Sequence, residues 1–182
     1  MRTPKCPCSL LLSALAYLVG WAVPTNPAFA DEIVLAQRGE PRAAIVVPAK
    51  PSKTGAFAAS ELQTYVKKVS GAELPILTEP GGAAKTLVFV GEGEATRALG
   101  FSAADLPPEG FLIKTAGNKL ALLGVDKSFT SATGETVDDP LHPRVQAGTL
   151  MAVYCFVERY LGVRWLWPGD EGEVVRPKDT LI

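Results

Sequence analysis

The sequence is poor in histidine and cysteine, and it has no long run of like charges. Its 182 residues include one histidine, His142, and three cysteines, with a formal net charge of −1. A transition-metal site normally uses several His or Cys ligands, so we expect neither a metal nor another cofactor. A weakly charged chain is also a poor ligand for polyanions. We therefore expect no nucleic-acid partner.

The first thirty residues have the three parts of a secretory signal peptide. Arg2 and Lys5 are positively charged, residues 9–23 are apolar, and Ala28–Ala30 form a small-x-small cleavage motif. The apolar part is too short for a membrane span. This pattern predicts a signal peptide over residues 1–30, and a single exported domain over residues 31–182 that has no membrane partner after cleavage. Cys155 is then the one remaining cysteine, which excludes an intrachain disulfide.

An amphipathic helix is predicted over residues 53–70. Ser52 or Thr54 can cap its first turn, and Gly71 is suited to end it. Its apolar positions share one face: Ala58, Leu62, Tyr65, Val66 and Val69.

Short apolar segments predict the strands. They are residues 33–37, 43–47, 74–77, 86–90, 111–115, 119–123, 163–167 and 173–175. A second long helix is expected over residues 150–161 with Thr149 as its cap, and residues 125–147 are expected to lack regular structure. Strands that arrive both with helices and as a hairpin predict an α+β or α/β fold, a mixed sheet with two main helices packed on it.

Several blocks of this sequence resemble one family in their order and spacing. They are residues 58–65, 71–76, 88–91, 110–113, 122–124 and, most extensively, 148–173. Together they are similar to the N-terminal accessory domain that precedes the catalytic barrel in bacterial β-hexosaminidases and α-glucuronidases. The sequence departs from that pattern at Met151 and Cys155.

The resemblance implies a setting of polysaccharide degradation. In those families the domain packs against a (β/α)₈-type barrel, and the barrel holds the catalytic acids. We therefore expect a non-catalytic accessory domain whose partner is a glycoside-hydrolase-type barrel that this chain does not contain. The alternatives are a free-standing glycan-binding module that uses Trp165, Trp167 and residues 125–147, and a small glycosidase acting alone.

Aromatic and acidic residues lie close together after the last helix. Trp165 and Trp167 share one side of a predicted strand, where they suit either interdomain packing or sugar stacking. Asp170, Glu171 and Glu173 follow them, and paired carboxylates near aromatics occur in glycosidases. We interpret these acids as members of a solvated turn, because nothing in the sequence raises the pKa of one of them.

Three other features receive structural interpretations. The run Val90–Glu94 follows a strand and opens a helix, but its two acidic residues would repel a phosphate. His142 is interpreted as a loop residue without a nucleophile nearby, and Cys155 as a buried, unreactive thiol.

The last helix is expected to present a docking face. Leu150, Val153, Tyr154, Val157 and Leu161 form the stripe that should pack on the sheet, but residues on the opposite side are apolar as well. A lone domain would carry polar residues there. The sequence thus predicts an exposed apolar patch around Met151 and Phe156, extending toward Trp167.

Cleavage of the signal peptide is directly testable. We expect the exported protein to begin at Asp31, because Ala28 and Ala30 satisfy the small-residue rule for the cleavage site. Intact-mass measurement of periplasmic or secreted material checks this. A mass that retains residues 1–30 in the exported fraction contradicts it.

Overall fold

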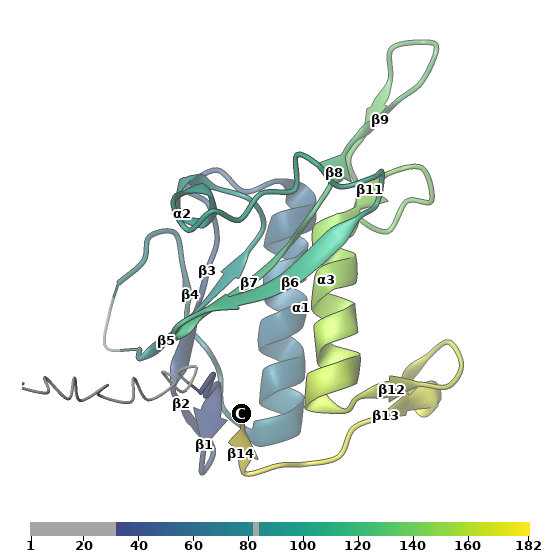
Figure 1. Cartoon of the computed structure of the whole chain (residues 1–182). Coiled ribbons are helices and arrows are strands. Elements are labelled where there is room, and N and C mark those ends of the chain that lie inside the picture. The colour runs from purple at the N-terminus through teal and green to yellow at the C-terminus, as the bar shows by residue number, and fades with distance from the viewer. Residues whose placement is uncertain (1–31, 82–83) are drawn as a thin grey trace, which may run out of the picture.

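The computed structural model describes residues 32–81 and 84–182 (Figure 1). The predicted signal peptide and its cleavage site before Asp31 lie outside these residues. Within the described ranges, no helix combines the length and apolar character that crossing a membrane requires.

A five-stranded mixed sheet occupies the centre of the molecule, with the order β4-β3-β5-β7-β6. Its strands are β3 (Ala43–Val46), β4 (Ile76–Leu77), β5 (Thr86–Val90), β6 (Phe111–Ala116) and β7 (Lys119–Gly124). The first four in space run parallel, and β6 pairs antiparallel with β7 through a tight turn. The predicted fold class, a mixed sheet carrying two main helices, is confirmed.

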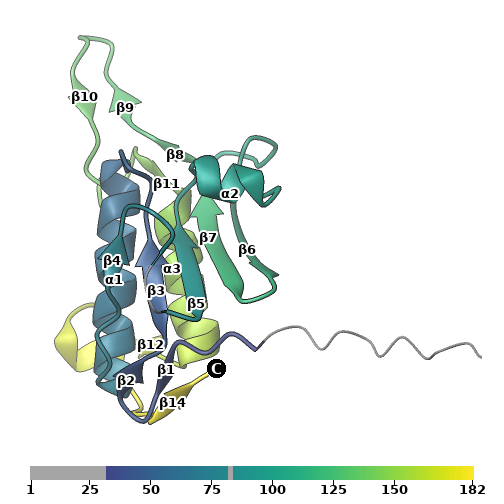
Figure 2. The same ribbon diagram turned by 90° about the vertical axis from the view of Figure 1, so that its left-hand side faces the viewer.

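The two long helices, α1 (Lys53–Ser70) and α3 (Gly148–Phe156), cover the same face of the sheet. The short helix α2 (Glu94–Ala98) lies on the other face, as Figure 2 shows. Ser52, one of the two expected caps, accepts a hydrogen bond from the Gly55 amide at 2.9 Å. Gly71 ends α1 in the left-handed conformation at φ 77°. A side-chain cap of this kind contributes about 1 kcal/mol.

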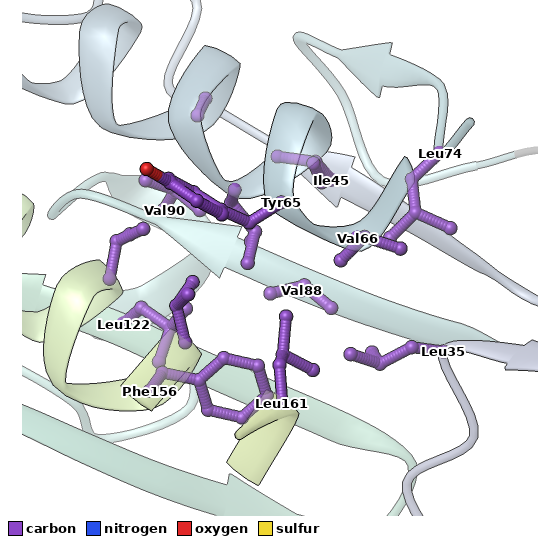
Figure 3. Close-up of a cluster of buried hydrophobic side chains, with 14 of the residues drawn as sticks. Leu35, Ile45, Tyr65, Val66, Leu74, Val88, Val90, Leu122, Phe156 and Leu161 are labelled. Carbon is purple, nitrogen blue, oxygen red and sulfur yellow. The ribbon is translucent and has the colours of Figure 1, made fainter. Parts of the chain in front are cut away.

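The main core lies between the two long helices and the sheet (Figure 3). Its largest fully buried side chains come from every layer: Leu35, Ile45, Leu62, Leu74, Leu120, Leu122 and Leu150. Each such leucine contributes roughly 1.5–3 kcal/mol through removal from water. A smaller cluster around Phe89 and Phe101 fills the opposite face beneath α2. The sheet is therefore covered on both faces, although unequally.

Three glycines allow the start of α3 to approach the end of β7. A Cβ atom on Gly124 would stand 2.7 Å from the Gly110 carbonyl oxygen, and one on Gly148 would stand 2.6 Å from the same atom. Real Cβ contacts are not that short, so any side chain at either position would push the elements apart. Backbone hydrogen bonds complete the junction: Val125 donates to Gly110 at 2.9 Å, and Gly148 donates to Val125 at 3.0 Å.

The capping of α3 differs from the prediction. Thr149 lies inside the helix, and its hydroxyl accepts a hydrogen bond from the Gly124 amide at 3.2 Å. The Thr149 amide instead donates to the Asp126 carboxylate at 2.9 Å. The cap thus comes from a residue 23 positions earlier in the chain, which a local sequence pattern cannot reveal.

The second half of the predicted helix also differs. The α-helix ends at Phe156 and continues as a π-helical turn, Val157–Leu161, closed by a hydrogen bond from Gly162 to Val157 at 3.0 Å. Phe156, before this turn, and Val157 and Leu161, within it, all lie in the core.

Residues 125–147, expected to lack regular structure, form two small antiparallel ladders. β8 (Asp126–Lys127) pairs with β11 (Gln146–Ala147), and β9 (Phe129–Thr130) pairs with β10 (Thr136–Val137). Two-residue ladders are too short to produce a recognisable alternation in the sequence. The β9–β10 arm projects away from the body of the molecule (Figure 1).

The C-terminal segment returns across the ends of the helices. β12 (Arg164–Trp165) pairs with β13 (Glu173–Val174) around a 3₁₀ turn, Asp170–Gly172. β14 (Thr180–Leu181) then pairs with β1 (Ala36–Gln37), which also pairs with β2 (Glu40–Pro41). The two ends of the described domain therefore lie side by side.

Asp126 links the first turns of both long helices, because its carboxylate also accepts from the Ser52 hydroxyl at 3.3 Å. Burial raises the pKa of Asp126, although the hydrogen bond from Thr149 opposes the shift. Burial of the ionised Asp126 carboxylate therefore destabilises the folded state. The hydrogen bonds that the carboxylate accepts stabilise the folded state.

We expect Asp126→Ala to lower the free energy of unfolding by about 1–2 kcal/mol, because the Thr149 amide loses its acceptor. Asp126→Asn should cost less, since an amide oxygen can still accept that hydrogen bond. Urea denaturation at pH 7 checks both, with Asp105→Ala at an exposed acid as the control. Equal stability of Asp126→Ala and the unchanged protein would show that this cap is dispensable.

Candidate functional site

A groove of about 510 Å³ lies along the outer side of α3, between the edge strand β6 and strand β12. It is lined by Tyr65, Phe111, Met151, Tyr154, Cys155, Glu158 and Trp165. Apolar side chains remain open to solvent there, with exposed fractions of 42% for Met151, 39% for Phe111 and 38% for Trp165. Large apolar side chains gathered at one exposed place are typical of a binding surface. We call this feature the aromatic groove.

Three rings from three elements form the wall of the aromatic groove. The ring of Trp165 meets Tyr65 edge-on at 5.3 Å between centroids, and it meets Tyr154 in the same manner at 5.5 Å. Such arrangements add about 0.5–1.5 kcal/mol each beyond the burial of area. Tyr65 comes from α1, Tyr154 from α3 and Trp165 from β12, so the wall forms only when all three elements are in place.

A chain of hydrogen bonds fixes Trp165 and Tyr65. The Trp165 indole Nε1 donates to the Tyr65 hydroxyl at 3.1 Å, and that hydroxyl donates to Glu173 at 3.0 Å. Glu173 also forms an ion pair with Lys68 at 2.6 Å. The Lys68 ammonium lies 5.0 Å from the centroid of the Tyr65 ring, within reach of a cation–π interaction.

Tyr154 has a separate carboxylate partner, because its hydroxyl donates to Glu61 at 2.9 Å. Burial, followed by this hydrogen bond, raises the pKa of Tyr154. All three polar atoms of the aromatic wall are therefore bonded within the protein. The groove presents mainly its apolar surface to a ligand.

Glu173 and Lys68, beside the groove, stabilise each other in their ionised forms. Burial alone would raise the pKa of Glu173, but the hydrogen bonds from Lys68 and Tyr65 outweigh it and leave this pKa below its ordinary value. The hydrogen bond to Glu173 in turn raises the pKa of Lys68. A general acid needs a raised carboxyl pKa, so Glu173 is poorly suited to that role.

The structure brings some of the expected site residues together and separates others. Trp165, Glu173 and Met151 meet at the aromatic groove. Trp167, which is 55% exposed, does not line it, because β12 ends at Trp165 and the chain turns there. Asp170 is exposed in the 3₁₀ turn.

The prediction that Phe156 belongs to an exposed docking face is wrong. This side chain is 6% exposed and belongs to the main core, where Figure 3 shows it together with Leu161. Its ring also stacks on Tyr160 at 5.1 Å. The predicted inner stripe was out of phase: Phe156 follows Ala152 by four positions and Val153 by three, so the α-helix itself places it on their buried face. The outer face instead consists of Met151, Tyr154 and Cys155.

Cys155 lines the groove and is half-buried, so the expected fully buried thiol is not observed. His142 lies in the loop as expected. Its ring stacks on Phe129 at 6.4 Å, and its Nδ1 accepts a hydrogen bond from the Arg144 amide at 3.3 Å.

A second concave region, of about 430 Å³, lies at the carboxyl ends of β3, β5 and β7. Ligands of open α/β sheets commonly bind at such an edge. Two carboxylates line it, but both are used internally: Glu92 accepts from the Ala103 amide at 2.8 Å, and Asp126 caps α3. The carboxylates of Glu92 and Asp126 are therefore engaged by backbone amides and are not free to bind a ligand.

Neither region contains a plausible metal centre. Among residues 32–81 and 84–182, no three His, Cys, Asp or Glu side chains gather closely enough to hold a metal ion.

Comparison of the sequence with protein-family models and with curated proteins finds no match. The assignment of a role to the aromatic groove therefore depends on its geometry and on the resemblance described above.

Four residues that line the groove were not predicted as site residues: Tyr65, Phe111, Tyr154 and Glu158. Glu61, the hydrogen-bond partner of Tyr154, was not predicted either. Tyr65 and Tyr154 were assigned to core stripes, and the single available signal was that each has a hydroxyl that must find a partner when buried.

The Glu173 network predicts a pH-dependent stability. Because the pKa of Glu173 is lower in the folded state, its stabilisation is present above its ordinary pKa of 4.5 and is lost as the pH falls through the folded-state value. We expect Glu173→Gln to lower the free energy of unfolding by about 1 kcal/mol at pH 7, a modest figure because Lys68 is partly exposed.

This difference should shrink when denaturation is repeated near pH 3, because the stabilisation by Glu173 is lost as the pH falls through its lowered folded-state pKa. Glu135→Gln, at the exposed turn of the β9–β10 arm, is the matched control and should show no loss at either pH. A difference between Glu173→Gln and the unchanged protein that is equally large at both pH values would contradict the assignment.

Proposed function

We propose that this chain is a non-catalytic accessory domain of an exported, carbohydrate-active protein. Its aromatic groove is the surface that packs against a glycoside-hydrolase-type catalytic barrel, present as a neighbouring domain or a separate chain. The signal-peptide pattern supports export, and the resemblance to the domain before the barrel of β-hexosaminidases and α-glucuronidases supports the partner.

One observation carries the proposal: the aromatic groove leaves large apolar side chains in solvent while its polar atoms are bonded internally. Met151, Phe111 and Trp165 are each more than a third exposed. The Trp165 indole and both tyrosine hydroxyls already have protein partners. Protein interfaces have an apolar centre of this kind, rich in aromatic residues and Met.

A free-standing glycan-binding module is the second candidate. Exposed Trp167 favours it, because an indole face open to solvent can stack on a pyranose ring, and Asp170 nearby could accept hydrogen bonds from sugar hydroxyls. At the groove itself, however, no aromatic hydroxyl or indole N–H remains unpaired to read a sugar.

The test pairs the chain with a barrel of this class encoded in the same or the adjacent reading frame. We expect a one-to-one complex in analytical ultracentrifugation and no turnover of aryl glycosides by the chain alone. Met151→Asp should weaken the complex by at least about tenfold, because it buries a charge at the centre of the interface.

Leu141→Asp is the matched control, since Leu141 is also an exposed apolar residue but does not line the groove. It should leave the affinity unchanged. Saturable binding on a glycan array that is lost in Trp167→Ala, without any complex with the barrel, would favour the second candidate. Turnover by the isolated chain that disappears in both Asp170→Asn and Glu173→Gln would overturn the non-catalytic role.

A further inference from the structure

The aromatic groove has an acidic border. Glu158 lines it directly and is exposed, and three more carboxylates lie around the aromatic wall: Glu61, Asp170 and Glu173. Two cations accompany them, Lys68 paired with Glu173 and Arg164 at 3.8 Å from Glu158. Among the residues that line the groove, Glu158 is the one charged side chain, so the lining is net negative. Arg159, although adjacent to Glu158, does not line the groove.

The charges at this border are not equally available. Glu173 is occupied by Lys68 and Tyr65, and Glu61 by Tyr154. Glu158 has a loose ion pair at 3.8 Å with Arg164, whose guanidinium donates to backbone carbonyls at 2.6 and 3.0 Å. Asp170 is exposed but does not line the groove, so Glu158 is the carboxylate placed to bind a group that enters it.

The interior of the groove suits a cation with an apolar stem. Phe111 and Met151 can pack on aliphatic carbons, and the aromatic wall can stack on a planar cation. The protein already contains one such contact, because Lys68 lies over the ring of Tyr65. A guanidinium group combines stacking on aromatic faces with forked hydrogen bonds to a carboxylate, which an ammonium group does not.

From this combination we infer that the aromatic groove receives an arginine side chain from the docking surface of the partner, with Glu158 as its counter-ion. This inference rests on the proposed function and specifies the chemistry of the partner. A second copy of this chain fits less well, since two net-negative linings would face each other. A neutral sugar would gain nothing from the charge of Glu158.

The experiment titrates the purified chain with N-acetyl-Leu-Arg-Leu-amide and with its citrulline counterpart, which has a similar shape and no charge. The Trp165 indole N–H resonance, identified by its loss in Trp165→Phe, reports binding. We expect the arginine peptide to shift this resonance saturably with a Kd of about 1 mM, and the citrulline peptide to bind at least about tenfold more weakly. The difference should decrease as salt is added.

Two variants with opposite expected effects on peptide binding test the role of Glu158. Glu158→Gln should reduce binding of the arginine peptide to the level of the citrulline peptide. Arg164→Gln should strengthen it, because the competing internal cation is removed. Glu135→Gln, on the distant arm, should change nothing.

Equal binding of the two peptides, or no shift with either at about ten times the expected Kd, would overturn the arginine inference. Either outcome would leave the proposed docking function standing, because that function is tested by the binding of the barrel. If Met151→Asp still breaks the complex with a barrel, the groove is a docking surface that binds apolar side chains alone.

Discussion

The close approach of α3 to the end of β7 is the constraint on which the rest of the structure depends. Gly110, Gly124 and Gly148 meet there with no room for a Cβ atom on either of the last two. Helix and sheet are therefore joined backbone to backbone, and Asp126 caps the helix from the strand side. This junction sets the angle and depth at which α3 lies on the sheet. Both the core beneath the helix and the groove beside it follow from that placement.

Helix α3 is apolar on two sides, and the described residues cover one of them. Its inner side, which includes Leu150 and Val153, is buried against the sheet and α1. Its outer side, with Met151 and Cys155, faces the space between β6 and β12. No described element fills that space. A rigid border of hydrogen-bonded rings lowers the entropy lost on binding, because side chains that are already ordered need not be ordered again.

Four acidic side chains serve as hydrogen-bond acceptors within the protein itself. Glu173 orders the aromatic wall, Glu61 holds Tyr154, Glu92 holds the Ala103 amide and Asp126 caps α3. Each of these carboxylates accepts hydrogen bonds from protein donors. Their arrangement therefore orders the backbone and the aromatic wall.

The sequence by itself determined those elements whose causes are local. Ser52 and Gly71 bound α1 as expected, because a cap and a left-handed glycine act within one turn of the helix. The central strands β3 and β5 also follow from their short apolar runs, since a strand buried on both faces needs apolar residues at every position. The fold class is a consequence of these elements and of their order.

The tertiary structure alone decided the details that involve distant partners. The cap of α3 comes from Asp126, 23 positions earlier, and Tyr65 meets Trp165 across 100 positions. The buried side of α3 runs through Ala152, Val153 and Phe156, which leaves Tyr154 and Cys155 on the outer face. Periodicity reports which residues share a face of a regular helix, but it carries no information about what lies opposite that face. The groove is formed where α3 faces β6 and β12, so it is defined only in the folded chain.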